Sequence, residues 1–182
     1  MRILPALTLG VPLDRDHVVA VGGIGQRLGV PPGRTLTYPH ISLLVLLECP
    51  DPAAVNAALA AVAARTRPFS VRARGFGVFN DGRLVLHVPV VRTAEFARLH
   101  RDLHDTVTAT GAQVDGHHTP ASWFPHVTLW DRTLTPAKLG EAVLELAAGP
   151  PIAWTLPVTR LARLEATGMT ATIPLGAVTS LP

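Results

Sequence analysis

Cysteine is nearly absent from the sequence, in which Cys49 is the single copy. A disulfide within the chain is therefore excluded, and one cysteine among 182 residues favours a reducing compartment. Charged residues are also scarce, at 16% of the chain against 48% hydrophobic residues, which excludes a disordered protein. A chain of this length buries roughly 70% of its unfolded surface on folding, so it needs neither a metal nor a disulfide for stability.

Long hydrophobic runs are missing too. The longest, residues 41–47 and 85–91, have the length of a strand and contain serine, histidine or proline. A helix that spans a membrane needs about 20 consecutive apolar residues. Residues 1–5 lack the apolar core of a signal peptide. We therefore expect a soluble, cytoplasmic protein that is a monomer and has no membrane partner.

Lysine occurs once, as Lys138, whereas arginine supplies the other fifteen of the sixteen cations. Arginine presents a planar fork that matches two phosphate oxygens, so this bias suits a ligand that carries phosphate. Genomic base composition is the simpler explanation, because alanine, glycine and proline are abundant as well. The net charge of +3 thus permits a phosphate-bearing ligand without requiring one.

The same order of predicted elements occurs twice along the chain. In the first half, apolar patterns and helix-start signals predict strand 3–11, helix 14–28, strand 38–47, helix 52–65 and strand 69–79. In the second half they predict strand 83–91, helix 93–108, strand 123–130, helix 136–148 and strand 152–164, and strand 169–175 ends the chain. Corresponding positions of the two halves lie about 80 to 86 residues apart.

No long linker separates the two halves, and the segment between them, Asn80-Asp81-Gly82, is typical of a hairpin turn. Strands joined by a hairpin are antiparallel neighbours. We therefore expect an α+β fold with antiparallel sheets, in which two similar lobes arise from an internal duplication. Residues 1–182 would form a single bilobal domain, with approximate repeats at 1–79 and 83–175.

A hexapeptide recurs in the second predicted strand of each half. Residues 38–43 read Tyr-Pro-His-Ile-Ser-Leu, and residues 124–129 read Phe-Pro-His-Val-Thr-Leu. The short pattern His-x-Ser/Thr is weak, because about one occurrence is expected by chance. The full pattern of aromatic, proline, histidine, aliphatic, hydroxyl and leucine residues occurs only at these two places, so it is specific.

Strand geometry indicates what this hexapeptide builds, because successive side chains point to opposite faces. One face of the first strand carries Tyr38, His40 and Ser42. The same face of the second strand carries Phe124, His126, Thr128 and Trp130. The aliphatic residues between them form the opposite faces and are expected to pack against helices.

Two imidazoles and two hydroxyls without a carboxylate suit phosphodiester chemistry. If the lobes face each other across a cleft, one neutral imidazole takes a proton from an attacking water or hydroxyl, and the other, protonated, gives one to the leaving oxygen. The hydroxyls donate hydrogen bonds to the non-bridging phosphate oxygens. Histidine suits both roles near neutral pH because its ordinary pKa is about 6.5. Buried structural histidines are the alternative explanation, but they do not account for a repeated hexapeptide.

The paired motifs, their spacing and the duplicated halves resemble the two-histidine (2H) phosphoesterase superfamily, in particular its bacterial 2'-5' RNA ligase and cyclic phosphodiesterase branch. Residues 68–79 and 83–90 are similar to the mid-chain hairpin of that family. The resemblance implies two lobes whose antiparallel sheets line a central cleft, with helices outside. It also implies metal-independent opening of 2',3'-cyclic phosphates without a cofactor, and in some members reversible 2'-5' ligation. The catalytic residues it implies are His40, Ser42, His126 and Thr128.

The sequence departs from the family pattern at two places. The family often has an arginine five residues after its second histidine, where this chain has Asp131 followed by Arg132. On a regular strand Arg132 shares the face of His126, whereas a bulge would reverse this. The family often has an aromatic residue five positions after its first histidine, where this chain has Val45.

The remaining candidates for substrate binding are aromatic residues and arginines. A nucleobase would stack on an aromatic ring near the histidines. The two arginines of strand 69–79 share one face of that strand. They would bind phosphate if this face lines the cleft, and they would be ordinary solvated residues if it does not. Two of the aromatics, Tyr38 and Phe124, are equally suited to cap the core. The predicted substrate-binding set is Tyr38, Phe124, Trp130, Arg132, Arg72 and Arg74.

Other histidines carry weaker signals. His100 and His104 have the helical spacing of zinc ligands but lack the accompanying glutamate, so a solvated helix face explains them better, and no metal site is expected. His117 and His118 lie in a loop before the second hexapeptide, either at the rim of the cleft or on an ordinary surface. His87 interrupts an apolar strand and is expected to be a hydrogen-bonded structural residue.

Three functions fit these observations. The first is an enzyme of RNA processing that binds RNA ends and opens their 2',3'-cyclic phosphates to 2'-phosphates, with reversible 2'-5' RNA ligation as a further activity that the resemblance allows. The second keeps the chemistry but acts on a small nucleotide of the ADP-ribose cyclic phosphate type. The third is a catalytically idle module that binds RNA or nucleotides. Steep salt dependence would favour RNA, and turnover of a nucleoside cyclic phosphate with chelator present would exclude the idle module.

Overall fold

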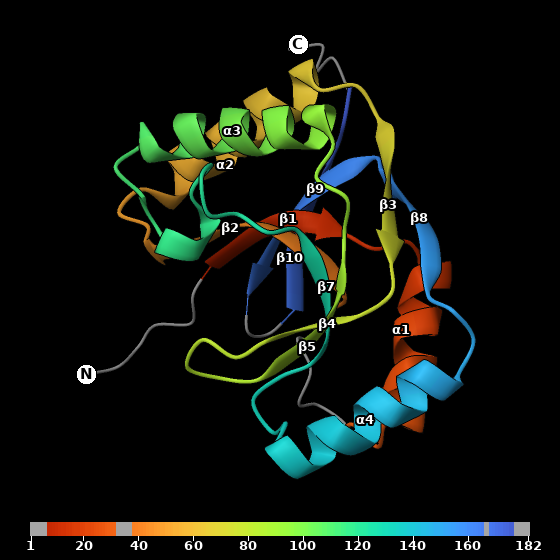
Figure 1. The fold of residues 1–182 in the computed structure, drawn as a ribbon. Helices are drawn as coiled ribbons and strands as arrows, with labels where there is room; N and C mark the ends of the chain where they lie inside the picture. The colour runs from red at the N-terminus through yellow and green to blue at the C-terminus, as the bar shows by residue number, and fades with distance from the viewer. Residues whose placement is uncertain (1–6, 32–37, 166–167, 177–182) are drawn as a thin grey trace.

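The largest element of the fold is an antiparallel sheet of eight strands (Figure 1). The computed structural model describes residues 7–31, 38–165 and 168–176. Seven strands follow the order β10-β9-β1-β2-β7-β5-β4, and the short β6 pairs with β2. Their bounds are β1 Leu7–Pro12, β2 His40–Glu48, β4 Gly77–Phe79, β5 Val85–Pro89, β6 Gln113–Val114, β7 His126–Trp130, β9 Arg160–Glu165 and β10 Gly168–Pro174. The predicted α+β class with antiparallel sheets is confirmed.

The two halves of the chain contribute strands to each other's side of this sheet. β4 comes from residues 1–79 yet lies beside β5, and β9 comes from residues 83–175 yet lies beside β1. A second, two-stranded sheet pairs β3 (Phe69–Arg74) with β8 (Ala153–Val158), again one strand from each half. The order β9-β1-β2 therefore mirrors the order β4-β5-β7, with β10 and β6 additional on the β2 side, and neither side is made from one half alone.

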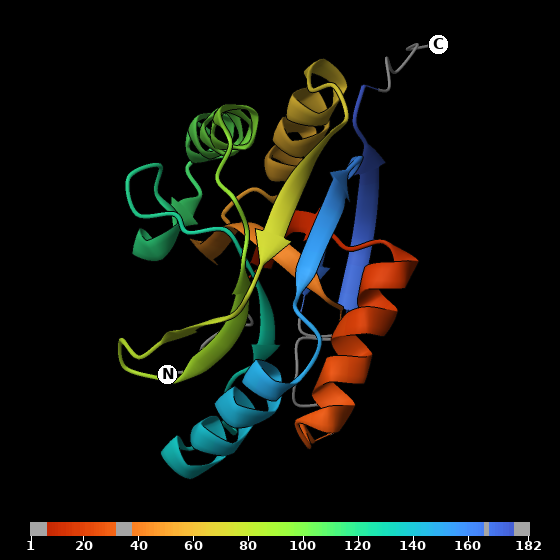
Figure 2. The same ribbon diagram turned by 45° about the vertical axis from the view of Figure 1, so that its right-hand side comes forward.

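The four α-helices of the described residues lie at two ends of this part of the chain, as two views show (Figures 1 and 2). Helices α2 (Pro52–Arg65) and α3 (Ala94–Thr108) pack side by side at one end. Helices α1 (Arg15–Arg27) and α4 (Pro136–Ala148) lie together at the other, where Arg27 approaches Glu145 at 3.7 Å. No helix in the described part of the chain is both long and apolar enough to cross a membrane.

The helices begin where the sequence predicts. The side chain of Asp51 accepts a hydrogen bond from Ala54 N, and that of Thr135 accepts one from Lys138 N. Each cap precedes a proline in the first turn, whose missing N–H would have no partner in a helix anyway. Helix α1 forms despite its three internal glycines because Val21 and Ile24 are buried against the core.

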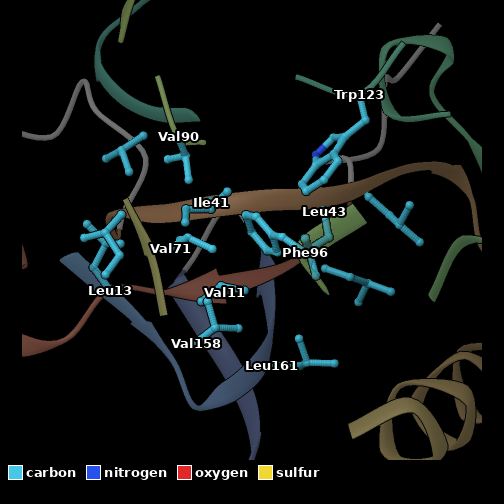
Figure 3. Packing of buried hydrophobic residues seen from close by; sticks show 14 of the residues in the cluster. Val11, Leu13, Ile41, Leu43, Val71, Val90, Phe96, Trp123, Val158 and Leu161 are labelled. Atoms are coloured by element: carbon cyan, nitrogen blue, oxygen red, sulfur yellow. The ribbon is translucent and has the colours of Figure 1, made fainter. Parts of the chain in front are cut away.

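The hydrophobic core fills the space between the two sheets. Val71 of β3 and Val158 of β8 lie close to Val11 and Ile41 of the large sheet (Figure 3). All four side chains are almost fully excluded from solvent. The aliphatic residues of the first hexapeptide thus face the core, as the alternation predicts, and the other face of the large sheet is left for the site.

Two long predicted strands are wrong, because each divides into two. Residues 69–79 divide at Gly75, whose φ of +66° is left-handed and readily adopted only by glycine, so β3 leaves the direction that β4 follows. Residues 152–164 divide at Thr159 into β8 and β9, which belong to different sheets. The predicted hairpin at residues 80–82 is confirmed, since it connects β4 with β5. Residues 3–6 of the first predicted strand lie outside the described residues.

Candidate active site

A cavity of about 550 Å³ lies over the junction of the two hexapeptide strands. Both histidines and both hydroxyl residues of the hexapeptides line it. Of the predicted substrate-binding residues, three line it as well: Tyr38, Phe124 and Arg132. The two repeated motifs therefore meet in one site, which is what a two-histidine mechanism requires.

The pairing of β2 with β7 explains this convergence. The two strands are antiparallel and pair at Ile41 and Val127, both fully buried on the core side. In an antiparallel pair, residues on either side of such a position point to the opposite face. His40 and Ser42 therefore share the cavity face with the corresponding residues of β7. The two strands pair at this one position.

Hydrogen bonds fix the same tautomer in the two motif histidines. His40 Nδ1 lies 2.8 Å from the Tyr38 carbonyl oxygen, and His126 Nδ1 lies 2.8 Å from that of Phe124. A carbonyl oxygen only accepts, so in each ring Nδ1 carries the proton and donates it. The Nε2 atom of each ring is then the one that exchanges a proton with a ligand.

The two motifs differ at that Nε2 atom. In His40 it lies 3.0 Å from Ser42 Oγ, whose hydroxyl donates to the neutral ring. In His126 it makes no hydrogen bond to the described residues, and Thr128 remains unengaged by the ring. His40 is only 5% exposed, whereas His126 is half-buried. One proton-transfer atom is thus already hydrogen-bonded, and the other is available.

Burial lowers the pKa of both motif histidines. For His40, burial outweighs the hydrogen bond to the Tyr38 carbonyl, and the positive charges of His126 and His118 lower the pKa further. For His126, burial again acts most strongly, and the Arg83 guanidinium adds to it. The neutral form of each ring is therefore favoured near pH 7, which suits a base. A bound phosphate anion would raise both pKa values and so support the acid.

Aromatic side chains pack against the ring of His126. The Phe79 ring packs edge-on against His126, with centroids 5.0 Å apart, and stacks on His87 at 4.0 Å. Both Phe79 and Phe124 line the cavity. The Phe124 ring is 49% exposed and packs edge-on against the Phe79 ring. Sequence reasoning missed Phe79, because the hairpin predicts that β4 lies beside β5 but nothing in the sequence places β5 beside β7. His87 is structural, as predicted: it is buried, and its Nδ1 donates to the Val85 carbonyl.

A β-bulge carries Val45 into the cavity. The register of β1 on β2 shifts so that Leu9 pairs with Leu44 but Gly10 pairs with Ser42, which leaves Leu43 as the extra residue. An odd offset from His40 would otherwise point Val45 into the core. Val45 lines the cavity, while Leu43 and Leu44 are both buried.

Three residues of the predicted substrate-binding set do not line the cavity. Trp130 is 2% exposed and does not line the cavity, because the start of α4 covers it: its Nε1 donates to Thr133 Oγ1, and Lys138 Nζ lies 5.5 Å from the ring. Arg72 and Arg74 are exposed on β3, outside the residues that line the cavity. They lie there because β3 pairs with β8 instead of joining the large sheet.

The end of β7 adds a carboxylate to the site. Asp131 lines the cavity and is 5% exposed, and its Oδ1 accepts no hydrogen bond from the described residues. Arg132 lines the cavity beside it, with its Nε 3.9 Å from Asp131 Oδ2 and a φ of 45°. The expectation of a site without a carboxylate is therefore wrong: the sequence marked Asp131 only as a departure from the family pattern, and the fold places it in the cavity.

The prediction of a solvated His100 is also wrong. Its ring is fully buried, stacks on Trp123 with centroids 4.1 Å apart, and donates from Nε2 to the His118 carbonyl. Both His117 and His118 line the cavity. Of the two locations that the sequence allowed for them, the rim of the cleft is therefore the one observed. Within the described residues, no cluster of three or more potential ligands fits a metal ion.

Comparison with known proteins identifies the class of this antiparallel, two-histidine site. The family model described as "2'-5' RNA ligase superfamily" matches residues 19–168, so the chain belongs to that superfamily, and the resemblance inferred from the hexapeptides is confirmed. No curated protein matches the sequence.

Solved structures share the fold at low sequence identity. TT0787 of Thermus thermophilus is 22% identical, with a TM-score of 0.69 over 95% of this chain and 99% of that chain. E. coli LigT in complex with 3'-AMP is 19% identical, with a TM-score of 0.57 over 94% and 95% of the two chains. The MHV ns2 PDE domain is 17% identical, with a TM-score of 0.52 over 92% and 99%.

Proposed function

We propose that this protein is a phosphodiesterase that opens 2',3'-cyclic phosphates at RNA or nucleotide ends and forms 2'-phosphates. The observation that carries the proposal is the pair of imidazoles in one cavity, each with Nδ1 engaged and Nε2 directed to the site. The superfamily supports a phosphoesterase or ligase activity, and the solved structures that share the fold include a PDE domain.

The reaction needs two proton transfers. One imidazole takes a proton from water at Nε2 as the water oxygen forms a bond to phosphorus. The other imidazole, protonated, gives its Nε2 proton to the 3'-oxygen as the bond from phosphorus to that oxygen breaks. The product is a 2'-phosphate with a free 3'-hydroxyl. The hydroxyls of Ser42 and Thr128 donate hydrogen bonds to the non-bridging oxygens, where negative charge concentrates.

Ligation uses the same groups with a different nucleophile. If the 5'-hydroxyl of a second RNA replaces water, the same two transfers produce a 2'-5' linkage and the 3'-hydroxyl. The reverse reaction regenerates the cyclic phosphate. Residues that serve hydrolysis should therefore serve ligation, and the ratio of the two products depends on whether water or a 5'-hydroxyl occupies the nucleophile position.

The decisive experiment is an assay on the four nucleoside 2',3'-cyclic phosphates with a chelator present throughout. We expect turnover by the wild type and a 2'-phosphate product, identified by chromatography against both isomers. Substitution of either motif histidine by alanine should reduce kcat by about 10²–10⁴-fold while the circular dichroism spectrum stays unchanged. Absence of turnover on every cyclic phosphate would contradict the proposal.

The charges of the site favour a substrate with few phosphates. The described residues that line the cavity include four carboxylates, Asp81, Asp115, Asp131 and Glu165, against two guanidiniums, Arg83 and Arg132. With the histidines neutral, this lining is net negative, so it repels a series of phosphates more strongly than a single one. A small nucleotide is therefore the second candidate substrate. Its kcat/KM should change little between 50 and 200 mM salt, whereas an RNA held through several phosphates should lose affinity steeply.

A further inference from the structure

A third imidazole faces the cavity beside the two motif histidines. His118 lies in the 3₁₀ turn η1 (Gly116–His118), and its side chain is 16% exposed. Its Nδ1 is buried without a hydrogen-bond partner among the described residues, and it lies 3.5 Å from Asp115 Oδ1, which is an ion-pair distance when the ring is protonated. Because His118 lines the cavity, Nε2 is the ring nitrogen available to a ligand. His118 differs from the motif histidines here, because their Nδ1 atoms donate hydrogen bonds at 2.8 Å whereas its Nδ1 faces a carboxylate at ion-pair distance.

The backbone around this ring is held from two directions. Asp115 N donates to the Val45 carbonyl of β2 at 2.8 Å. His100 of α3 donates from Nε2 to the His118 carbonyl at 3.0 Å, and its ring is itself stacked on Trp123. Buried hydrogen bonds of this kind fix the position of the turn relative to the sheet that carries the motif histidines. His118 is therefore a positioned group and not a side chain on a loose surface loop.

The charges around His118 make its protonation sensitive to a bound anion. Burial lowers the pKa of His118 most strongly, Asp115 offsets this only in part, and His126 and His117 lower the pKa further, so the neutral ring is favoured until an anion binds. A positive charge on His118 in turn lowers the pKa of His40. Across the mouth of the cavity, Asp81 lies 3.9 Å from the ring of His117. The three inner imidazoles thus repel one another when protonated, and an anion between them would relieve that repulsion.

We propose that His118, held by Asp115, contacts the phosphate and compensates the second negative charge that appears when the cyclic ester opens. The idea rests on the proposed function, because that reaction converts a singly charged diester into a monoester with a charge of about −1.5 to −2 at pH 7. Two imidazoles alternate as base and acid and cannot both remain cationic. In a cavity rich in carboxylates, a third cationic group, protonated His118, compensates the second negative charge of the product phosphate.

The test compares His118→Gln with His104→Gln. His104 is a matched control, because its Nδ1 lies 3.2 Å from Asp105 Oδ1 on α3, outside the residues that line the cavity. The probes are inorganic phosphate and adenosine 2'-monophosphate. Titration calorimetry at pH 6.5, in two buffers of different ionisation enthalpy, gives both the Kd and the number of protons taken up. Asp115→Asn, which keeps the cap of the 3₁₀ turn, tests the carboxylate.

The wild type should take up protons when either probe binds. In His118→Gln we expect the Kd of both probes to rise about tenfold and proton uptake to fall, while KM for a cyclic phosphate changes less than threefold. Asp115→Asn should lie between the wild type and this variant, and His104→Gln should match the wild type. Unchanged Kd and proton uptake in His118→Gln would overturn the proposal.

Two further outcomes are distinguishable. If His118→Gln does not fold, His118→Asn serves in its place, since its amide replaces Nδ1 beside Asp115 but carries no charge to the cavity. Binding is read without turnover, so a wild type that binds phosphate with His118-dependent proton uptake but opens no cyclic ester contradicts the proposed reaction alone. Normal turnover with His118-independent binding contradicts the role of His118 alone.

Discussion

The two hexapeptides share their sequence pattern and their hydrogen-bonded tautomer, yet their surroundings differ. Beside Ser42 in β2 lies Gly10 of β1, and beside Thr128 in β7 lies His87 of β5. A Cβ atom at Gly10 would lie 3.4 Å from the ring of His40, so the absence of a side chain there lets this ring pack closely against β1. His126 instead rests against the rings of Phe79 and His87.

This difference shows that a repeated motif determines the orientation of its histidine but not its environment. The same local bond to the carbonyl two residues earlier forms in both strands, because both have the same backbone geometry. Depth, charge and the partner of Nε2 come from neighbouring strands. We expect the two rings to perform different proton transfers for that reason, and five predictions test the comparison.

Loss of either motif histidine should have the largest effect. His40→Ala and His126→Ala are each expected to lower kcat for cyclic-phosphate hydrolysis by about 10²–10⁴-fold, because each removes one proton transfer. The double variant should be only slightly slower than the worse single variant, since groups that act together are not additive. Wild-type kcat in either folded single variant would remove that residue from the mechanism. Stopped-time assays with chelator give the rates.

The pH profile separates the two rings. Activity requires one neutral and one protonated imidazole, so kcat/KM should rise and then fall with pH. Burial lowers the pKa of both rings, so the centre of the bell should lie below the ordinary value of 6.5. The kcat profile should lie at higher pH, because the bound phosphate raises both pKa values. Each single histidine variant should keep only one limb of the bell in its residual activity. A flat wild-type profile of kcat/KM against pH, with chemistry shown to limit the rate, would contradict the two-histidine mechanism.

The hydroxyls should matter less than the imidazoles. Ser42→Ala and Thr128→Ala each remove a hydrogen bond to the phosphate, at a cost on the order of 1–4 kcal/mol of transition-state stabilisation. Ser42→Ala should be the more harmful, because it also leaves Nε2 of the buried His40 without its partner. Equal losses in kcat/KM would show that this bond in the free protein is unimportant. Ser42→Thr is the control that restores the hydroxyl.

Acid should destabilise the folded protein through His87, the buried neighbour of the second hexapeptide. Burial and the charge of His126 lower the pKa of His87 to about 4, against an ordinary 6.5. The unfolded chain therefore binds more protons between these values, so stability is full above pH 6.5 and falls as the pH drops towards 4. The contribution is on the order of 3 kcal/mol. Urea unfolding from pH 7 to 4.5 should show a shallower loss for His87→Gln than for the wild type.

Gly10 should tolerate no side chain, although the expected cost is the smallest. A Cβ there would lie 2.6 Å from the Ile41 carbonyl oxygen, so β1 and β2 would have to move apart. We expect Gly10→Ala to lose about 1–3 kcal/mol in unfolding free energy and to reduce kcat by displacing His40. Gly22→Ala, at a helical position with open space, is the matched control. Equal stability of the two variants would contradict the close approach.

Sequence reasoning succeeded where the signal is local. The starts of α2 and α4 depend on one capping side chain and on the proline that follows it, so a few residues suffice to predict them. It failed where distant segments decide. Trp130 shares the alternation of His126, but α4 folds back over it. Arg72 and Arg74 alternate as predicted, but β3 joins another sheet.

The sequence by itself determined the local chemistry: which residues alternate on each strand, and which helices are capped. It also placed two histidines and two hydroxyls in equivalent strands, because a period of two is a property of the extended backbone. Only the tertiary structure decided which strands become neighbours. That choice buried Asp131, carried Val45 across a bulge and placed His118 beside His40, because strand pairing depends on contacts between residues far apart in the chain.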